Sequence, residues 1–89
     1  MKHVKIRVHG KVQGVYFRAS TMDTALELGI TGFVRNEPDG SVYIEAEGSP
    51  EAVEGLIIWC NTGPPRARVE KVEITEGDPV HFGRFELRR

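Results

Sequence analysis

Two hydrophobic repeats alternate along this sequence, and their order restricts the possible folds more than any other feature. A two-residue repeat, typical of a strand with one buried face, places Val4, Ile6 and Val8 on one side. Strand-like segments then recur at four further places. In order along the chain, the expected strands are residues 4–8, 30–36, 41–48, 67–75 and 85–87.

Two segments between these strands have the spacing of amphipathic helices instead. The first is expected to end at Gly29, because glycine readily adopts the left-handed conformation that terminates a helix. The second is expected to begin at Ser49 and Pro50, a favourable N-cap and first-turn residue, and to end within 61–65. The apolar positions are Ala19, Met22, Ala25 and Leu26 in the first helix, and Val53, Leu56, Ile57 and Cys60 in the second.

The resulting order is β-α-β-β-α-β with a short strand at the end. Residues 37–40 read Glu-Pro-Asp-Gly, a strong turn signal that predicts a hairpin between the second and third strands. This order predicts an α+β, ferredoxin-like fold, a split β-α-β sandwich with two helices on one face of an antiparallel sheet. With 89 residues, we expect a single domain spanning 1–89. A parity slip between Val69 and Val72 predicts either a bulge in the fourth strand or a later start of that strand.

Charge is balanced overall but not along the chain. The net charge is −1, with +4 in residues 1–36 and −5 in the remainder. Such balance argues against non-specific nucleic-acid binding, whereas the basic first part favours an anionic ligand. Cys60 is the only cysteine, so no disulfide is expected within the chain. No signal peptide or membrane-spanning stretch is recognisable, and we expect a cytoplasmic protein.

The segment from Gly10 to Ser20, GKVQGVYFRAS, connects the first strand to the first helix and contains no acidic residue. Gly10 and Gly14 permit close backbone approach, and the loop leads into a helix N-terminus whose N–H groups lack partners within the helix. Those amides can surround a tetrahedral anion, and Arg18 can bind two of its oxygens. On pattern alone, an ordinary glycine-containing connection with a surface arginine explains the segment equally well.

Four motifs resemble those of one enzyme family, in order and over essentially the whole chain. GKVQGVYFR (10–18) is similar to the phosphate-loop signature of the acylphosphatases, and GFVRNEPDGSV (32–42) to their second motif. GPPRARV (63–69) and the C-terminal FELRR resemble two further family motifs. The family's fold is the ferredoxin-like one, so the resemblance agrees with the fold expected from periodicity.

The resemblance implies hydrolysis of acyl phosphates to a carboxylate and inorganic phosphate. It assigns phosphate binding to Arg18 and orientation of the attacking water to Asn36, the two catalytic residues. It also implies that backbone amides hold the other phosphoryl oxygens, namely those of Gln13, Gly14, Val15, Tyr16 and Phe17. No cofactor and no metal are expected, and the partners are the small-molecule substrate and its phosphate product. We expect no nucleic acid, no membrane and a monomer.

Other polar residues are given simpler roles. Arg35 precedes Asn36 in its strand and should therefore lie on the opposite face of the sheet. Glu37 follows Asn36 and is expected to point into solvent rather than towards a bound substrate. His3 and His9 are expected on the polar face of the first strand, and the three histidines have no metal-ligand spacing.

Two alternatives to catalysis remain open at this point. Ferredoxin-like domains also serve as binding modules, so the fold alone does not decide between catalysis and ligand binding. An RNA-binding module would need exposed aromatic residues in basic surroundings, and Phe33 and Tyr43 match that pattern poorly. A non-catalytic phosphate-binding or carbamoyl-phosphate-handling module is the other alternative, because acylphosphatase-like domains also occur within larger maturation proteins.

Overall fold

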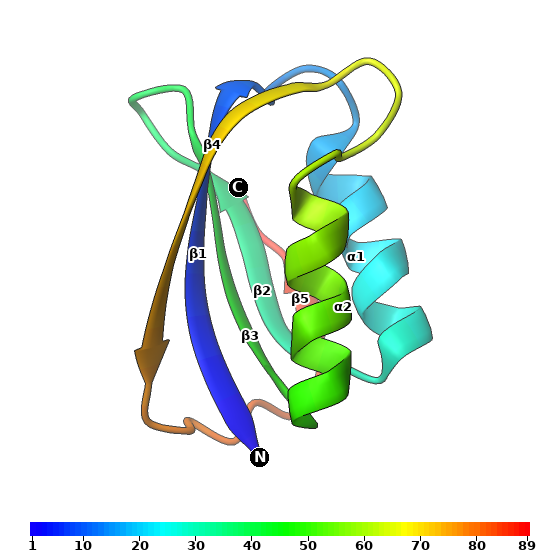
Figure 1. The fold of residues 1–89 in the computed structure, drawn as a ribbon, viewed down its shortest axis with the longest axis vertical. Coiled ribbons are helices and arrows are strands. Elements are labelled where there is room, and N and C mark those ends of the chain that lie inside the picture. The colour runs from blue at the N-terminus through cyan, green and yellow to red at the C-terminus, as the bar shows by residue number, and fades with distance from the viewer.

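The computed structural model describes all 89 residues, as a five-stranded sheet with two helices on one face (Figure 1). The predicted order of elements is confirmed. The sheet, however, is mixed rather than wholly antiparallel, because the last strand runs parallel to its neighbour. The elements are β1 (Lys2–Lys11), α1 (Phe17–Leu28), β2 (Thr31–Asn36), β3 (Val42–Gly48), α2 (Pro50–Cys60), β4 (Arg68–Gly77) and β5 (Phe85–Leu87).

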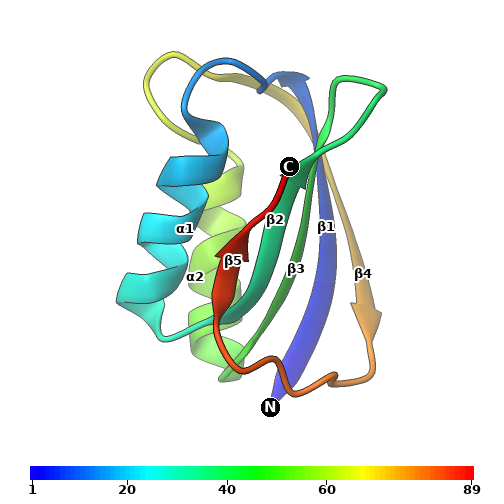
Figure 2. The same cartoon turned by 180° about the vertical axis from the view of Figure 1, so that it is seen from behind.

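The strand order β4-β1-β3-β2-β5 brings distant parts of the sequence together at one end of the molecule. β1 lies between β4 and β3 and is antiparallel to both, while β2 lies between β3 and β5. In consequence the loop after β1, the turn after β2 and the loop before β4 are all at the upper end in Figure 1. Figure 2 shows β5 along the edge of β2, with the C-terminus close to this end.

The hydrophobic core lies between the helices and the sheet face that they cover. Val4, Ile6 and Val8 are fully buried on that face, as their alternation predicts. In α1 the buried side is Phe17, Thr21 and Ala25, whereas Leu26 is 57% exposed. The prediction was therefore wrong for Leu26 and for Ala19, which is also exposed, because the line i, i+4, i+8 from Phe17 faces the sheet. Neither helix is long and apolar enough to cross a membrane.

The predicted bulge is confirmed in β4. Its pairing with β1 shifts between His9 and Gly10, which pair with Lys71 and Val69, so Glu70 has no partner in β1. The close approach also requires glycine at position 10, where φ is +127° and a Cβ atom would overlap the carbonyl oxygen of Arg68. The bulge therefore bends β4 at the end where the loops gather.

A buried carboxylate fastens the connection between β4 and β5 to the other face of the sheet. Glu47 on β3 is 1% exposed and accepts hydrogen bonds from the backbone N–H groups of Val80, His81 and Phe82. It also hydrogen bonds to Nδ1 of His3, at 2.7 Å. His3 is thus buried at 2% exposure rather than solvated, because this connection covers the polar side of β1.

The contacts of Glu47 predict how stability depends on pH. Burial raises the pKa of this carboxyl, but the hydrogen bonds from Val80, His3, Phe82 and His81 outweigh it and lower the pKa below its ordinary 4.5. A lowered folded-state pKa contributes stability that is present above pH 4.5 and is lost as the pH falls through the folded value. We expect Glu47→Gln to flatten the decline in unfolding free energy below pH 4.5, measured by urea denaturation. An unchanged slope would contradict this assignment.

Candidate active site

Arg18 and Asn36, which are 18 residues apart in the sequence, line the same pocket. The pocket has a volume of about 370 Å³, and its lining includes residues of the loop after β1 and of the loop before β4. Arg18 comes from the first turn of α1, and Asn36 is the last residue of β2. The complete lining is Val12, Gly14, Tyr16, Phe17, Arg18, Ala19, Asn36, Arg66 and Leu87.

The loop before α1, which contributes to the pocket lining, has unpaired backbone amides. Gly14 and Tyr16 both have left-handed backbone conformations, with φ of 74° and 64°. The first hydrogen bond of the helix runs from the N–H of Ser20 to the carbonyl of Tyr16, at 3.0 Å. The N–H groups of residues 13–19 donate no hydrogen bond within the chain. A run of free donors at a helix N-terminus is the arrangement that binds tetrahedral anions.

The N-termini of the two helices differ, and the difference favours an anion site at α1 rather than at α2. α2 is capped by the Ser49 hydroxyl, which accepts from the N–H of Ala52, and Glu51 lies in its first turn. α1 has neither a side-chain cap nor an acidic residue in its first turn. The partial positive charge at the N-terminus of α1 is therefore not compensated by the chain itself.

The five residues assigned to amide binding have different side-chain positions. Gly14, Tyr16 and Phe17 line the pocket, and Val15 is buried in the hydrophobic core. Gln13 lies away from the pocket, and its Nε2 donates to the carbonyl oxygens of Glu37 and Ser41, at 2.8 and 2.9 Å. This side chain ties the loop before α1 to the β2–β3 turn, and so fixes the amides relative to Asn36.

The guanidinium of Arg18 is held by the C-terminal segment. Its Nη1 donates to the carbonyl oxygen of Arg88 at 2.9 Å, and the N–H of Arg88 donates to the carbonyl of Val34 at 2.8 Å. No carboxylate lies within ion-pairing distance of Arg18. The arginine is therefore positioned through the strand that carries Asn36, yet its charge remains available to an anion.

Asn36 has an acceptor atom that no group of the chain satisfies. Its Oδ1 is buried and without a hydrogen-bond partner, the only buried side-chain polar atom of which this is true. Buried acceptors are nearly always hydrogen bonded, so an orphan beside a pocket calls for a donor from outside the chain. A water molecule or another small donor can fulfil that need.

Four pocket residues were missed by the sequence reasoning, namely Val12, Ala19, Arg66 and Leu87. Ala19 could have been found, because every helix leaves its first N–H groups free and Ala19 lies in the first turn. Arg66 and Leu87 come from the loop before β4 and from β5. Their approach depends on the tertiary fold, and no local sequence signal indicates it.

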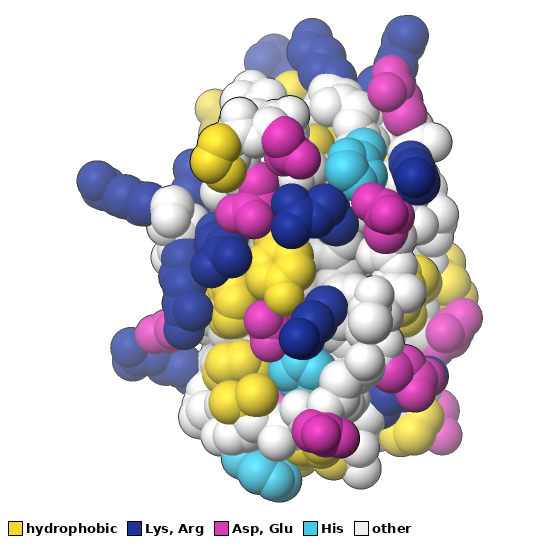
Figure 3. All heavy atoms as spheres, turned by 90° about the vertical axis from the view of Figure 1, so that its left-hand side faces the viewer, with side chains coloured by type: hydrophobic (Ala, Val, Ile, Leu, Met, Phe, Trp, Pro, Cys, Tyr) yellow, Lys and Arg dark blue, Asp and Glu magenta, His cyan; other side chains and the backbone are white.

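The neighbours of Asn36 in the sequence lie on the open face of the sheet. Arg35 stacks over the ring of Tyr43 at 4.9 Å, as its alternation with Asn36 predicts. Glu37 was expected to point into solvent, but its carboxylate accepts from Arg35 at 3.0 Å and from Arg7 at 3.4 Å. Its charge is therefore neutralised outside the pocket. Figure 3 shows this open face, where basic and acidic side chains surround a hydrophobic patch.

Two other reactive residue types take no part in the pocket. Cys60 is fully buried, and burial raises its pKa to about 12, so a thiolate nucleophile is scarce near neutral pH. No group of three or more His, Cys, Asp or Glu side chains is placed to hold a metal ion. His9 instead pairs with Glu73 at 2.6 Å on the open face of the sheet.

The fold and the pocket together define a class of small ferredoxin-like proteins in which a glycine-containing loop and a strand end line one pocket. The acylphosphatase family model matches residues 4–87, and the chain belongs to the acylphosphatase family. An acylphosphatase of Natronomonas pharaonis is 52% identical over 89 residues, covering 96% of this chain and 97% of that protein. An acylphosphatase of Methylococcus capsulatus is 53% identical, covering 85% and 83%.

A solved structure of this family has the same fold. The crystal structure of acylphosphatase from Bacillus subtilis superposes with a TM-score of 0.97 at 32% identity, covering 100% of both chains. The expected fold is thereby confirmed, and so is the expectation that the chain is an enzyme of the acylphosphatase type. Family and fold both support hydrolysis of acyl phosphates.

Proposed function

We propose that the pocket hydrolyses acyl phosphates by in-line attack of a water molecule that Asn36 orients. The observation that supports this proposal is that Arg18 and Asn36 line one pocket next to a loop, residues 13–19, whose N–H groups have no acceptor in the chain. In the reaction, the water oxygen forms a bond to phosphorus while the bond from phosphorus to the acyl oxygen breaks. The products are a carboxylate and inorganic phosphate.

The phosphoryl group is bound by fixed positive potential. Arg18 provides a guanidinium that can form two parallel hydrogen bonds, and the loop amides provide donors to the remaining oxygens. We assign these donors to Gln13–Phe17, and extend the set to the N–H groups of Arg18 and Ala19, which are equally free. Since these groups are in place before the reaction, they stabilise the transition state without reorganisation.

A neutral amide suits the position beside the attacking water. The buried Oδ1 of Asn36 can accept a hydrogen bond from that water and so direct a lone pair of its oxygen towards phosphorus. A carboxylate in the same position would repel the dianionic phosphoryl group. A strong base is not required, because phosphoryl transfer depends mainly on positioning and on charge stabilisation.

The leaving group explains why the reaction can proceed without a general acid. A carboxylate has a low pKa, so it departs from phosphorus without prior protonation. We therefore propose that the chain requires no metal and no cofactor. We further propose that residues 1–89 form one domain and that the protein is a cytoplasmic monomer. Its partners are the diffusible substrate and the phosphate product, and it does not bind nucleic acid.

The test compares benzoyl phosphate with ATP, each in excess EDTA. We expect turnover of benzoyl phosphate, followed by its absorbance, and little release of phosphate from ATP. ATP carries no acyl phosphate, and its leaving group is poorer in the absence of a metal ion. Binding of phosphate without turnover of benzoyl phosphate would favour a binding module, including one that handles carbamoyl phosphate, over an enzyme.

The link from Gln13 to the β2–β3 turn gives a prediction about positioning. Gln13→Ala removes both hydrogen bonds of its side chain to that turn but keeps the backbone amide. We expect kcat/KM for benzoyl phosphate to fall about tenfold, because the amides lose their fixed relation to Asn36. Lys11→Ala, in the same segment but exposed and without an ion pair, is the control. A value for Gln13→Ala within twofold of the control would contradict the positioning role.

A further inference from the structure

Arg66 is a second guanidinium in the pocket, and the hydrolytic reaction described above gives it no task. It lies in the loop between α2 and β4 and lines the pocket together with Arg18 and Asn36. It forms no ion pair with any carboxylate of the chain, nor any hydrogen bond through its side chain. Its charge is therefore free to bind a ligand.

The backbone beneath Arg66 is firmly held against the start of α1. Pro64 is buried, and the N–H of Ala67 donates to its carbonyl at 3.0 Å. Gly63 has φ of +68° and lies so close to the Phe17 ring that a Cβ atom would be 2.6 Å from it. Because Phe17 also begins the helix that carries Arg18, the root of the Arg66 side chain keeps a fixed relation to the phosphate loop.

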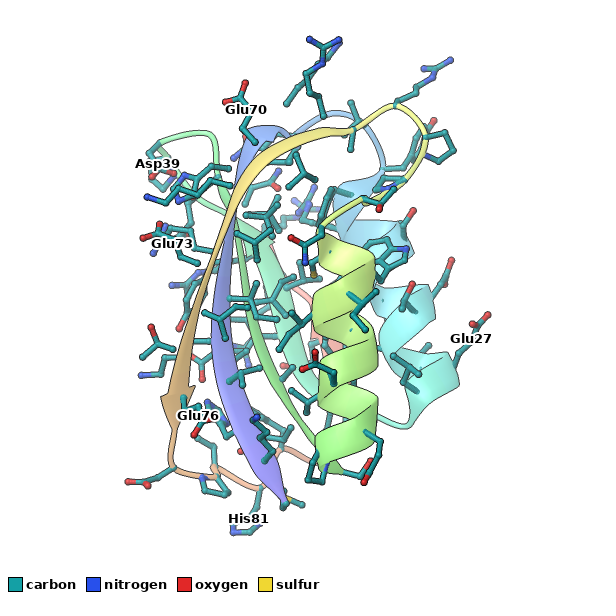
Figure 4. The ribbon with its side chains drawn as sticks, viewed as in Figure 1. Glu27, Asp39, Glu70, Glu73, Glu76 and His81 are labelled. Atoms are coloured by element: carbon teal, nitrogen blue, oxygen red, sulfur yellow. The ribbon has the colours of Figure 1, made fainter.

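Four cations near the pocket have no carboxylate partner. Most basic side chains on the open face or near β5 pair with carboxylates, for example Arg7 with Glu37 and Arg88 with Glu86. No carboxylate lies within 4 Å of Lys11, Arg18, Arg66 or Arg68. Figure 4 shows Glu70 at the end where the loops gather, beside β1 and β4, Asp39 at the tip of the β2–β3 turn, and Glu73 lower down on the side of the open face.

The pocket also offers apolar surface next to its two arginines. Tyr16 is 75% exposed and Leu87 is 41% exposed, and both contribute to the lining. In the proposed reaction, Arg18 and the loop amides already bind the single phosphoryl group. A ligand that uses the whole pocket would thus have a phosphoryl group, a short carbon skeleton and a second negative charge.

We propose that Arg66 forms a second anion subsite, which selects acyl phosphates whose acyl group carries a further carboxylate or phosphate. This rests on the proposed function for the identity of the first group, and goes beyond it by naming a substrate class. Arg66 is accordingly a specificity residue. Its contribution should be modest, about fivefold in affinity, because its side chain is exposed to water.

Non-hydrolysable phosphonates test the subsite independently of turnover. Dissociation constants are measured by calorimetry for pentylphosphonate, 5-phosphonopentanoate and pentane-1,5-bisphosphonate, which differ in the group at the far end. We expect the wild-type chain to bind the two doubly anionic probes about fivefold more tightly than pentylphosphonate. Their ranking identifies whether a carboxylate or a phosphate is the better second group.

Two matched variants distinguish a specific subsite at Arg66 from general electrostatic attraction of anions to this end of the molecule. Arg66→Ala and Arg68→Ala each remove one exposed positive charge from the same end, but Arg68 does not line the pocket. We expect Arg66→Ala to abolish the preference for the doubly anionic probes, and Arg68→Ala to keep it within twofold. The subsite is overturned if both variants show the same preference, or if the wild-type chain shows none.

Hydrolysis of benzoyl phosphate, measured on the same wild-type preparation, keeps the two proposals apart. Turnover together with a preference that does not depend on Arg66 overturns the subsite alone. An Arg66-dependent preference without turnover supports the subsite and contradicts the proposed reaction. A chain that binds none of the probes contradicts the anion pocket itself, and the subsite with it.

Discussion

Replacement of Arg18 or Asn36 by alanine lowers kcat for benzoyl phosphate about 100- to 1000-fold in each case, which is the loss typical of one preorganised catalytic contact. Arg18→Ala removes the guanidinium to which we assign phosphate binding. Asn36→Ala removes the buried, unpartnered acceptor to which we assign orientation of the water. Both fold normally, because neither side chain belongs to the hydrophobic core. Stopped-flow or steady-state assays measure kcat, and thermal unfolding checks that each variant is folded.

Arg35→Ala is the matched control for these two variants. Arg35 adjoins Asn36 in β2 and has the same charge as Arg18, but it lies on the open face with Glu37 and Tyr43. We expect its kcat to remain within about twofold of wild type, since exposed ion pairs contribute little. A near-normal kcat in Asn36→Ala would remove the water-orienting role, and a near-normal kcat in Arg18→Ala would remove the phosphate-binding role.

Glu47→Ala lowers the unfolding free energy by at least about 3 kcal/mol, the typical cost of removing one member of a buried charged network. The carboxylate is shared by three backbone N–H groups and by His3, and all four lose their acceptor together. For a domain of this size, the melting temperature should fall by roughly 12–24 °C. Urea unfolding at pH 7 and calorimetry measure the two effects.

The comparison for this variant is Glu76→Ala. Glu76 forms only a surface pair with Lys2, at 3.2 Å, and its side chain is 74% exposed. Surface pairs of this kind contribute about 1 kcal/mol or less. If Glu47→Ala were no more destabilising than Glu76→Ala, Glu47 would not be what fastens the β4–β5 connection to the sheet.

Local sequence patterns predicted the helices and strands well, because the start and end of each element depend on residues that are close in the sequence. Gly29 ends α1 in the left-handed conformation, with φ of 71°, and its N–H bonds back to the helix as expected of a C-terminal stop. The N-cap of α2 at Ser49 and the bulge near Val69 follow from similarly short-range chemistry. The orientation of α1 did not follow, since its apolar residues do not define one face and Leu26 remains exposed.

The misses share a cause, which is contact between residues far apart in the chain. His3 alternates correctly with Val4, yet it is buried because residues 80–82 cross over it. Glu37 follows Asn36, and nothing local indicates that Arg7, thirty positions earlier, would help to neutralise it. Arg66 lines the pocket, and its loop is positioned by a long-range contact in which Gly63 lies against the Phe17 ring. Alternation identifies a face of the sheet but not what covers it.

The most direct test of the central claim is a crystal structure of the chain with inorganic phosphate. We predict one anion in the pocket, within hydrogen-bond distance of the Arg18 guanidinium and of several N–H groups from residues 13–19. A water bound to Oδ1 of Asn36 should lie about 3 Å from phosphorus, opposite the position of the leaving oxygen. Phosphate bound elsewhere, or bound to Arg18 with Asn36 turned away from it, would contradict the account.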